Sequence, residues 1–403
     1  MSQPAVAPLS SEESERLVAT RRDLHAHPEL AYLETRTAQI VAERLAAAGY
    51  TIQTGVAQTG VVARLCGSQP GKTLLLRADM DALPIQEVGE HDYRSQHAGV
   101  MHACGHDGHV AALLTTAERL ASADLPGTLV LCFQPAEEGR GGAEAMIAAG
   151  VLDRVDAVCG IHLWNGLPTG TIGLAEGPVM AAVDRFDLVL RGQGGHGAMP
   201  HQTRDPLVAA AQLVTALQTI VSRETSPLDS CVVTVGMLTA GDTFNVIPAE
   251  ARLSGTCRTY APAAHAALPE RFRRVVEGIA AAHAVEATID YQRICSPTIN
   301  HPEFTAWARE VAGEVFGPGV VRTSGEGTQT MAGEDFSAFL ERLPGCFAFV
   351  GSKNPERGLI EPHHSDRFDF DESALEVSAR FLEGVARRYL SSRGLGSCAK
   401  VSE

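Results

Sequence analysis

Residues 101–114 read MHACGHDGHVAALL, in which three histidines, a cysteine and an aspartate directly precede an apolar stretch. The two glycines of this segment disfavour a continuous helix through the polar cluster, so a helix is expected to begin near His106. Apolar runs lie on both sides of it, at TLLLRA (73–78) and TLVLCF (128–133). Such uninterrupted apolar runs are typical of parallel strands buried on both faces. The strand–helix–strand order predicts an α/β fold with a doubly wound, mostly parallel sheet.

The same pattern extends through the rest of the outer chain. Two more apolar runs, AVCGIH (157–162) and CFAFV (346–350), are predicted strands of this sheet. Helical spacing of apolar residues predicts helices at about 10–24, 37–48 and 372–390. These elements belong to a single α/β domain, although they lie far apart in the sequence.

The pattern changes between residues 184 and 295. Segments such as FDLVLRG and ARLSGTCRTY alternate polar and apolar residues, as half-exposed antiparallel strands do. Two long helical stretches accompany them, at about 205–223 and 263–283. The sequence therefore predicts a smaller α+β domain, residues 184–295, inserted into an α/β domain made of residues 1–183 and 296–403.

The composition excludes several classes of partner. The 403 residues carry a formal net charge of -15, so the surface is expected to repel nucleic acid and anionic membranes. No run approaches the roughly 18 consecutive apolar residues of a membrane span, and the first residues lack the features of a secretory signal. Nine cysteines are scattered without a C-x-x-C pair, which favours a reducing, cytoplasmic location.

Acidic and imidazole side chains follow the predicted strands, at the points where the strands end. They are Asp79, Asp81, Glu137, Glu138, His162, His363 and His364. Ligands bind beyond the carboxyl ends of parallel strands, so these side chains are expected to converge near residues 101–114. Each has an ordinary alternative, such as a solvated acidic turn or an interior histidine, but together they need a cation to offset their charge. The spacing of these residues in the sequence does not show which of them bind the divalent metal. The candidates are His102, Cys104, His106 and His109.

These motifs resemble those of the M20 metallopeptidase superfamily, in particular its amidohydrolase branch. That branch includes hippurate hydrolase, N-acyl-L-amino acid amidohydrolases and indole-3-acetyl-amino acid hydrolases. The matching segments are LRADMDALPIQE, MHACGHDGHVAALL, QPAEEGRGGA, GIHLWNGLPTGTIG, GQGGHGAMPHQTRDP, FNVIPAEA, AGEDFS and HHSDRFD. The resemblance extends from HAHPEL (25–30) to the closing helix, and it implies that the inserted domain serves as a lid and dimerisation domain.

The resemblance implies two divalent ions per subunit, Mn²⁺ or Zn²⁺ with Co²⁺ or Ni²⁺ also accepted. The implied ligands are Cys104, His106, Glu138, His162 and His364. The thiolate of Cys104 is expected to bridge the two ions, Glu137 to be the general base, and Asp79 to lie beside the ligands without binding metal. Where the family commonly has H-S-P, this chain has Asp366 after His364 and Ser365, which puts the conformation of that loop in question.

The implied activity is hydrolysis of the amide bond of N-acyl amino acids to a carboxylate and a free amino acid. By the same resemblance, His196 reaches the site from the partner subunit of a homodimer (a tetramer being the larger possibility), Asn245 contacts the tetrahedral centre, and Arg258 is a candidate clamp for the substrate carboxylate. The alternatives are a dipeptidase or carboxypeptidase of the same superfamily, an amidase with Cys104 as nucleophile, and a metal-binding scaffold without activity.

Overall fold

The computed structural model describes residues 6–392, which divide into two compact units. Within the described residues, unit 1 consists of 6–177, 299–329 and 338–392, and unit 2 of Pro178–Thr298 and Thr330–Ser337. This division lies within a few residues of the expected insertion at 184–295. It differs in assigning residues 330–337 to unit 2, because Met180 bridges to Thr330 and the Ala181 N–H donates to the Ala332 carbonyl at 2.9 Å.

An eight-stranded sheet forms the centre of unit 1, in the order β1-β2-β4-β3-β5-β16-β6-β15. Its strands are β1 (Thr51–Val56), β2 (Gly60–Cys66), β3 (Thr73–Asp79), β4 (Thr128–Gln134), β5 (Ala157–Pro168), β6 (Ile172–Gly173), β15 (Val321–Arg322) and β16 (Gly345–Lys353). The four central strands, β4, β3, β5 and β16, are parallel, whereas β1, β2 and β6 introduce antiparallel pairs. The predicted doubly wound, mostly parallel sheet is therefore confirmed.

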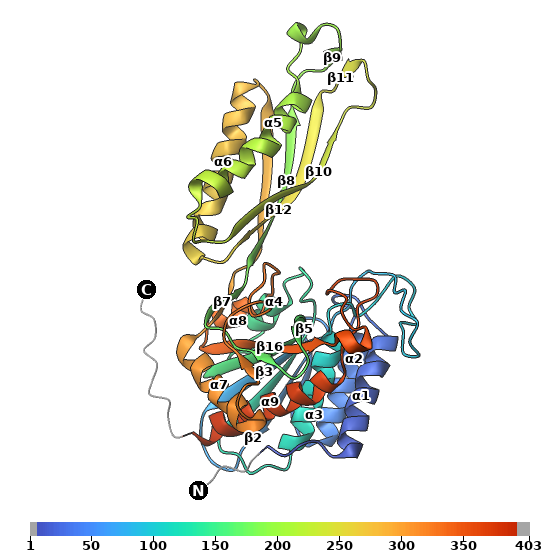
Figure 1. Cartoon of the computed structure of the whole chain (residues 1–403), viewed down its shortest axis with the longest axis vertical. Helices are drawn as coiled ribbons and strands as arrows, with labels where there is room; N and C mark the ends of the chain where they lie inside the picture. Colours follow the sequence, from blue (N-terminus) through green and yellow to red (C-terminus); the bar gives the residue numbers. More distant parts are fainter. Residues whose placement is uncertain (1–5, 393–403) are drawn as a thin grey trace. The chain divides into compact units, whose positions relative to one another are not determined.

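The central strands are apolar throughout because both faces of the sheet are buried. On β3, Leu74 and Leu76 join the main hydrophobic core, and Leu75 between them is equally buried on the other face. Helices complete the layers (Figure 1). They are α1 (Ser11–Ala26), α2 (Thr35–Ala47), α3 (His106–Leu120), α4 (Gly142–Ala148), α7 (Pro302–Phe316), α8 (Ser337–Leu340) and α9 (Ser373–Ser391). Helix α3 packs between α1 and α9 on the sheet and has scarcely any exposed side chain in its first three turns.

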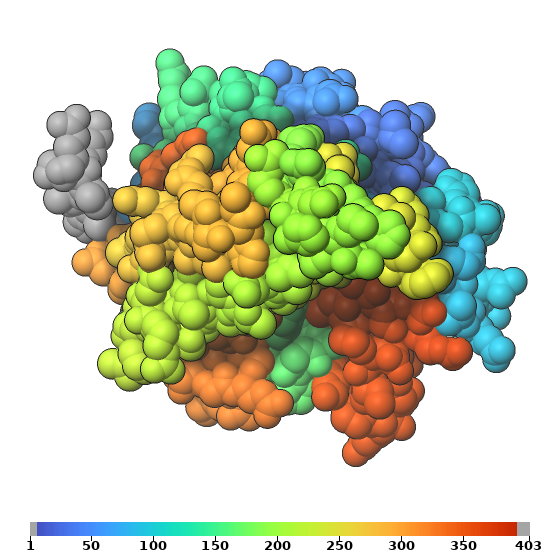
Figure 2. All heavy atoms as spheres, turned by 90° about the horizontal axis from the view of Figure 1, so that it is seen from above, coloured from blue at the N-terminus to red at the C-terminus, as the bar shows by residue number. Residues whose placement is uncertain are grey.

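A two-layer α+β arrangement forms unit 2. A four-stranded antiparallel sheet of order β10-β12-β8-β13 is covered on one face by two helices, which pack against each other (Figure 1). Figure 2 shows the surface of this unit from above. The elements are β8 (Ala182–Arg191), β10 (Cys231–Ala240), β12 (Glu250–Thr259), β13 (Glu286–Cys295), α5 (Pro206–Thr219) and α6 (Pro262–Ala282). Alternate residues of β8, among them Phe186 and Leu188, are buried under the helices. This explains the polar–apolar alternation of the segment.

The remaining elements are short. Two short strand pairs, β9 (Gly195–His196) with β11 (Val246–Ile247) and β7 (Gly177–Met180) with β14 (Thr298–Asn300), stand apart from the large sheets. Single helical turns are η1 (Pro200–Gln202), η2 (Ile220–Glu224) and η3 (Pro355–Arg357). Within residues 6–392, helices of the length and apolarity needed to cross a bilayer are absent.

Gly108 allows α3 to approach β5 and α9 closely. A Cβ atom at this position would meet the side chain of Leu163, and would lie 2.9 Å from Phe370 Cζ and 3.1 Å from Leu375 Cδ2. All three neighbours are buried in the main core. In an open helix, alanine is favoured over glycine by roughly 1 kcal/mol, but overpacking a core costs about 1–3 kcal/mol. Packing is therefore expected to outweigh helix propensity, so that an alanine at position 108 destabilises the folded protein.

We predict that Gly108→Ala lowers the free energy of unfolding, by up to about 2 kcal/mol after the gain in helix propensity. Gly313 in α7 is the matched control, because a Cβ there meets no atom within 4 Å. Gly313→Ala should leave stability unchanged or raise it. Denaturant unfolding of both variants tests this. A stabilised Gly108→Ala protein would show that the core around α3 accommodates the added methyl group.

Candidate metal centre

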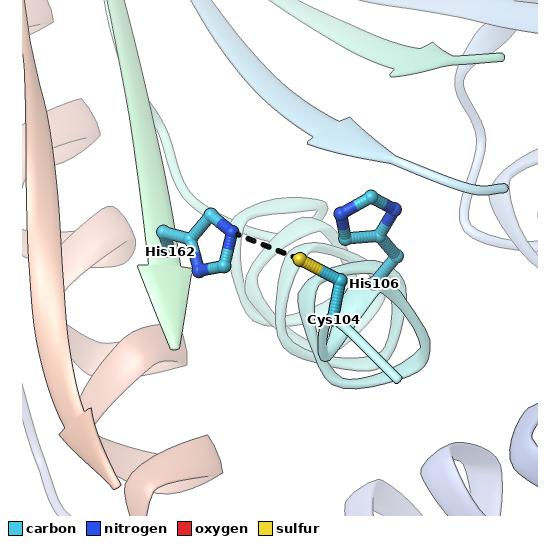
Figure 3. A group of neighbouring side chains, drawn as sticks. All are labelled: Cys104, His106 and His162. Atoms are coloured by element: carbon cyan, nitrogen blue, oxygen red, sulfur yellow. Dashed lines mark hydrogen bonds between the residues drawn. The ribbon is translucent and has the colours of Figure 1, made fainter. Parts of the chain in front are cut away.

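The predicted metal ligands in unit 1 come from four parts of the chain that meet at one edge of the sheet. Cys104 and His106 lie at the start of α3, His162 lies on β5, Glu138 follows β4, and His364 lies in the loop after β16. The left-handed conformation of Gly105, with φ +91°, ends the incoming loop and starts the helix. Figure 3 shows the first two of these side chains facing His162 across the site.

Cys104 is the member shared by two groups of ligand-type atoms. Its Sγ lies 3.6 Å from His162 Nε2. Cys104, His106 and His162 form one group and Cys104, Glu138 and His364 form the other, and the ligand atoms within each group lie within 4.8 Å of one another. His364 Nε2 is 3.2 Å from Glu138 Oε1. A sulfur common to two such groups is the arrangement expected of a ligand that bridges two ions.

The buried imidazoles of His106 and His162 each have one ring nitrogen that is available to a metal. His106 Nδ1 donates to the Asp81 carbonyl at 2.8 Å, and its Nε2 is buried without a hydrogen-bond partner among the described residues. His162 Nδ1 donates to the Leu163 carbonyl at 2.7 Å, which leaves Nε2 facing Cys104. Hydrogen bonding at one ring nitrogen is how proteins orient metal-binding histidines. The donor set of thiol, imidazole and carboxylate fits Zn²⁺, Mn²⁺ and similar ions.

The tertiary contacts show that one histidine of the 101–114 cluster, His109, is occupied elsewhere. His109 Nδ1 donates to Asp79 Oδ1 at 2.6 Å, and its Nε2 accepts the Leu163 N–H at 2.9 Å, so neither nitrogen is available to a metal. His102 differs, because both of its ring nitrogens are buried without a hydrogen-bond partner among the described residues. Burial lowers its pKa to about 4, and its ring lies toward α1, 6.4 Å from the ring of His25. Spacing alone gave no basis for this distinction.

Asp79 is fully buried next to the ligands. Its two oxygens contact the Arg77 guanidinium, at 2.6 Å from NH1, and His109 Nδ1, also at 2.6 Å. Burial would raise the pKa of Asp79, but the charges of Arg77 and the neighbouring imidazoles hold that pKa well below its usual range. Asp79 is thus a permanent anion whose oxygens already have partners. That Asp79 lies beside the ligands without binding metal stays a prediction, since Asp79, His106 and His109 also form a group of ligand-type atoms.

The loop that carries His364 is held by contacts that sequence reasoning missed. Asn165 on β5 donates its side-chain amide to the carbonyls of Glu361 and Asp369, both at 2.9 Å, and thereby ties the two ends of the loop together. His364 has a left-handed backbone with φ 65°, and its N–H donates to the Ala103 carbonyl at 2.8 Å. The only signal in the sequence that points to Asn165 is its position three residues after the predicted ligand His162.

A second histidine–carboxylate group lies on the α1 side of the cluster. His25 Nδ1 contacts Asp107 at 2.8 Å and its Nε2 contacts Glu87 at 3.3 Å, while His91 Nε2 also contacts Glu87 at 2.8 Å. Burial and the nearby Arg21 lower the pKa of His25, but the two carboxylate contacts outweigh them and raise it. A protonated His25 therefore satisfies this group without a metal ion.

The three site residues predicted in the inserted segment all lie in unit 2. His196 on β9 pairs with Val246 on β11, and the Gly197 N–H donates to the Asn245 carbonyl at 2.8 Å, so His196 and Asn245 are neighbours. Arg258 lies near the far end of β12. It is eight residues from Glu250, where that strand begins, which is roughly 27 Å along an extended strand. Its NH1 donates to the Thr256 hydroxyl and, at 3.0 Å, to the Cys257 carbonyl. Its role as a carboxylate clamp stays a prediction.

An α/β sheet with a thiol shared by two donor groups at the carboxyl ends of its strands is the arrangement expected of an enzyme that uses two metal ions. The sequence model of peptidase family M20/M25/M40 matches residues 75–388, and the chain belongs to this family. It is accordingly a metal-dependent hydrolase that acts on amide bonds.

Individual relatives agree with this assignment. An N-acyl-L-amino acid amidohydrolase from Geobacillus stearothermophilus is 46% identical over 306 residues, covering 75% of this chain and 83% of the relative. Thermostable carboxypeptidase 2 from Saccharolobus solfataricus is 38% identical over 369 residues, covering 90% and 92%. The solved structure of a dinuclear metal-binding M20 peptidase from Bacillus subtilis has a TM-score of 0.81 at 37% identity, covering 94% of this chain and 99% of that one.

We predict that a chelator abolishes amide hydrolysis and lowers the melting temperature, because ions that bind only the folded state stabilise it by mass action. Readdition of Mn²⁺ or Zn²⁺ should restore both. The measurements are thermal unfolding, metal content and amine release on one preparation. Full activity in a metal-free sample, with loss on thiol alkylation, would instead identify Cys104 as a nucleophile.

Proposed function

We propose that this enzyme hydrolyses the amide bond of N-acyl amino acids, releasing a carboxylate and a free amino acid. The observation that carries the proposal is the placement of Glu137 beside Glu138 in one turn, with ligand-type atoms of His106, Glu137 and Glu138 within 4.8 Å of one another. Of this pair, Glu138 is proposed as a metal ligand and Glu137 as the group that transfers the proton. The amidohydrolase relative supports this substrate class.

The residues proposed to hold the two divalent ions are Cys104, His106, Glu138, His162 and His364. Ions held there would lower the pKa of water and polarise the amide carbonyl. Cys104, His106 and His162 are buried, whereas 52% of the His364 side chain and 16% of the Glu138 side chain are exposed. A substrate therefore approaches from the side of Glu138 and His364. The choice between Mn²⁺ and Zn²⁺ rests on metal analysis of the purified enzyme.

Glu137 is proposed as the general base and then the general acid. Its carboxylate accepts a proton from the attacking water and returns it to the departing amine, so one side chain serves both steps of the reaction. Asp79 supports the reaction electrostatically, as an anion that holds His109 and Arg77 in place next to the ligands.

We predict that Glu137→Gln retains its metal ions and loses at least about 10²–10⁴-fold in kcat, because an amide cannot accept the proton. Metal content by mass spectrometry and initial rates with N-acetyl and N-benzoyl amino acids test this. Glu144→Gln on the exposed side of α4 is a suitable control, since that carboxylate pairs with Arg342 on the surface. A Glu137→Gln enzyme with wild-type turnover would exclude Glu137 as the base.

A homodimer is the proposed functional unit, with His196 and Asn245 completing the partner's site. The support is the surface around them. Phe244 is 100% exposed, Val246 50% and Met199 45%. These apolar side chains flank the exposed His196 and Asn245 on the β9–β11 pair. Such an apolar patch is typical of a surface covered by another protein chain.

Arg258 is proposed as the clamp for the free carboxylate of the substrate.

We predict complementation between two inactive variants, His196→Ala and Glu137→Gln. A mixed dimer regains one complete site if His196 acts across the interface, so mixing under subunit exchange should restore part of the activity. Each variant alone, and a mixture without exchange, provides the baseline. If exchange is demonstrated by differential labelling and activity stays at that baseline, His196 acts within its own subunit or not at all.

The second candidate is a carboxypeptidase activity, which the relative from Saccharolobus solfataricus favours. The two activities attack the same bond type and differ in what precedes it, an acyl group or a peptide. A panel of N-acyl amino acids and matched dipeptides separates them by kcat/KM.

The scattered cysteines support a reducing cytoplasm as the working location.

A further inference from the structure

The turn that carries the proposed base and one proposed ligand has an unfavourable backbone. Ala136, directly before Glu137, has a left-handed conformation with φ 57°. A residue with a Cβ atom is strained in this region of backbone conformation, and surrounding structure must hold it there. If the turn relaxed, both Glu137 and Glu138 would move.

Three consecutive backbone N–H groups of this turn donate to two carboxylates from distant parts of the chain. The Ala136 N–H donates to Glu34 Oε1 at 2.9 Å. The N–H groups of Glu137 and Glu138 donate to Asp81 Oδ1 and Oδ2, at 2.9 and 3.0 Å. Both carboxylates are buried, with 0% of Glu34 and 1% of Asp81 exposed. Hydrogen bonds to an ionised acceptor are roughly twice as strong as neutral ones.

The two carboxylates are themselves anchored. Glu34 directly precedes α2, and its Oε2 accepts the Thr59 hydroxyl at 2.5 Å. Asp81 follows β3, and its backbone carbonyl accepts His106 Nδ1 at 2.8 Å. Asp81 therefore connects the turn of Glu137 and Glu138 to the ring of a proposed ligand on α3.

We propose that Asp81 and Glu34 are positioning residues, which fix the 136–138 turn so that Glu137 and Glu138 keep their places in the site. The inference rests on the proposed function, because that function gives the turn its role in catalysis. Neither carboxylate touches the substrate. Each acts through the backbone of the turn.

The two positions differ in what an amide replacement does. Both oxygens of Asp81 face N–H donors, and an asparagine has only one oxygen, so its amide nitrogen would face a donor. Glu34 faces one N–H and one hydroxyl, and a hydroxyl can accept as well as donate. Glutamine therefore satisfies both partners of Glu34, whereas asparagine leaves one partner of Asp81 unsatisfied.

We predict that Asp81→Asn lowers kcat by about 10–100-fold at saturating metal, a typical loss when a group supporting a metal site is removed. KM should stay within about threefold, and the second metal equivalent should bind about 10–100-fold more weakly because Glu138 is displaced. Glu34→Gln should stay within about threefold of the wild type in both measurements. Steady-state kinetics and metal titration with Zn²⁺ provide the readouts.

Glu29 offers a matched control in the same part of unit 1. Its two oxygens also accept two adjacent N–H groups, those of Arg36 and Thr37, both at 2.9 Å. Glu29→Gln creates the same conflict at the start of α2 without involving residues 136–138. It should lower the melting temperature as Asp81→Asn does, while kcat and metal affinity stay at wild-type values.

A folded Asp81→Asn enzyme with wild-type kcat and metal affinity would overturn the proposal, as would an equal loss of kcat in Glu29→Gln. If Asp81→Asn does not fold, Glu34→Ala decides the matter together with Ala136→Gly. Glycine adopts a left-handed backbone without strain, so the double variant should recover part of the kcat lost in Glu34→Ala. No recovery in a folded double variant contradicts the proposal.

These results are separable from the proposed function itself. If the wild-type enzyme releases no amine from N-acyl amino acids, the proposed substrate class is wrong. The weaker metal binding expected of Asp81→Asn, compared with Glu29→Gln, still tests the positioning role in that case.

Discussion

The crowding of ligand-type groups around the Cys104 sulfur is the constraint on which the rest of unit 1 depends. Burial raises the pKa of the Cys104 thiol, and the neighbouring Glu138 raises it further. A thiolate, two carboxylates and several imidazoles are costly to hold together in a buried place unless cations offset their charge. An ion bound there would replace the proton of the thiol, so ion binding and the ionisation of Cys104 would be coupled.

The parallel sheet makes such crowding possible by bringing segments distant in sequence to one edge. Its strand ends fix the backbone, and the hydrogen bonds behind each ligand fix the side chain. The carbonyl of Asp81 orients His106, that of Leu163 orients His162, and that of Ala103 holds the backbone of His364. A site supported in this way loses little conformational entropy when metal binds.

Much of the fold and part of the site were predictable from local patterns. Unbroken apolar runs indicated β3, β4, β5 and β16, and the change to alternating residues indicated the antiparallel sheet of unit 2. The ligand set followed from resemblance, since spacing left four candidates in the 101–114 segment. The roles of Glu34 and Asn165 were not predictable, because their partners lie about 100 and 200 residues away.

Periodicity and residue type are local properties, so the amino-acid sequence alone indicates which segments become strands and helices and which side chains are chemically able to bind metal. Which of the histidines have a ring nitrogen available for a metal depends on the assembled fold. His109 is occupied by Asp79 and Leu163, whereas His106 keeps one nitrogen directed into the site. That difference depends on hydrogen bonds between residues far apart in the chain, which exist only after the sheet has assembled.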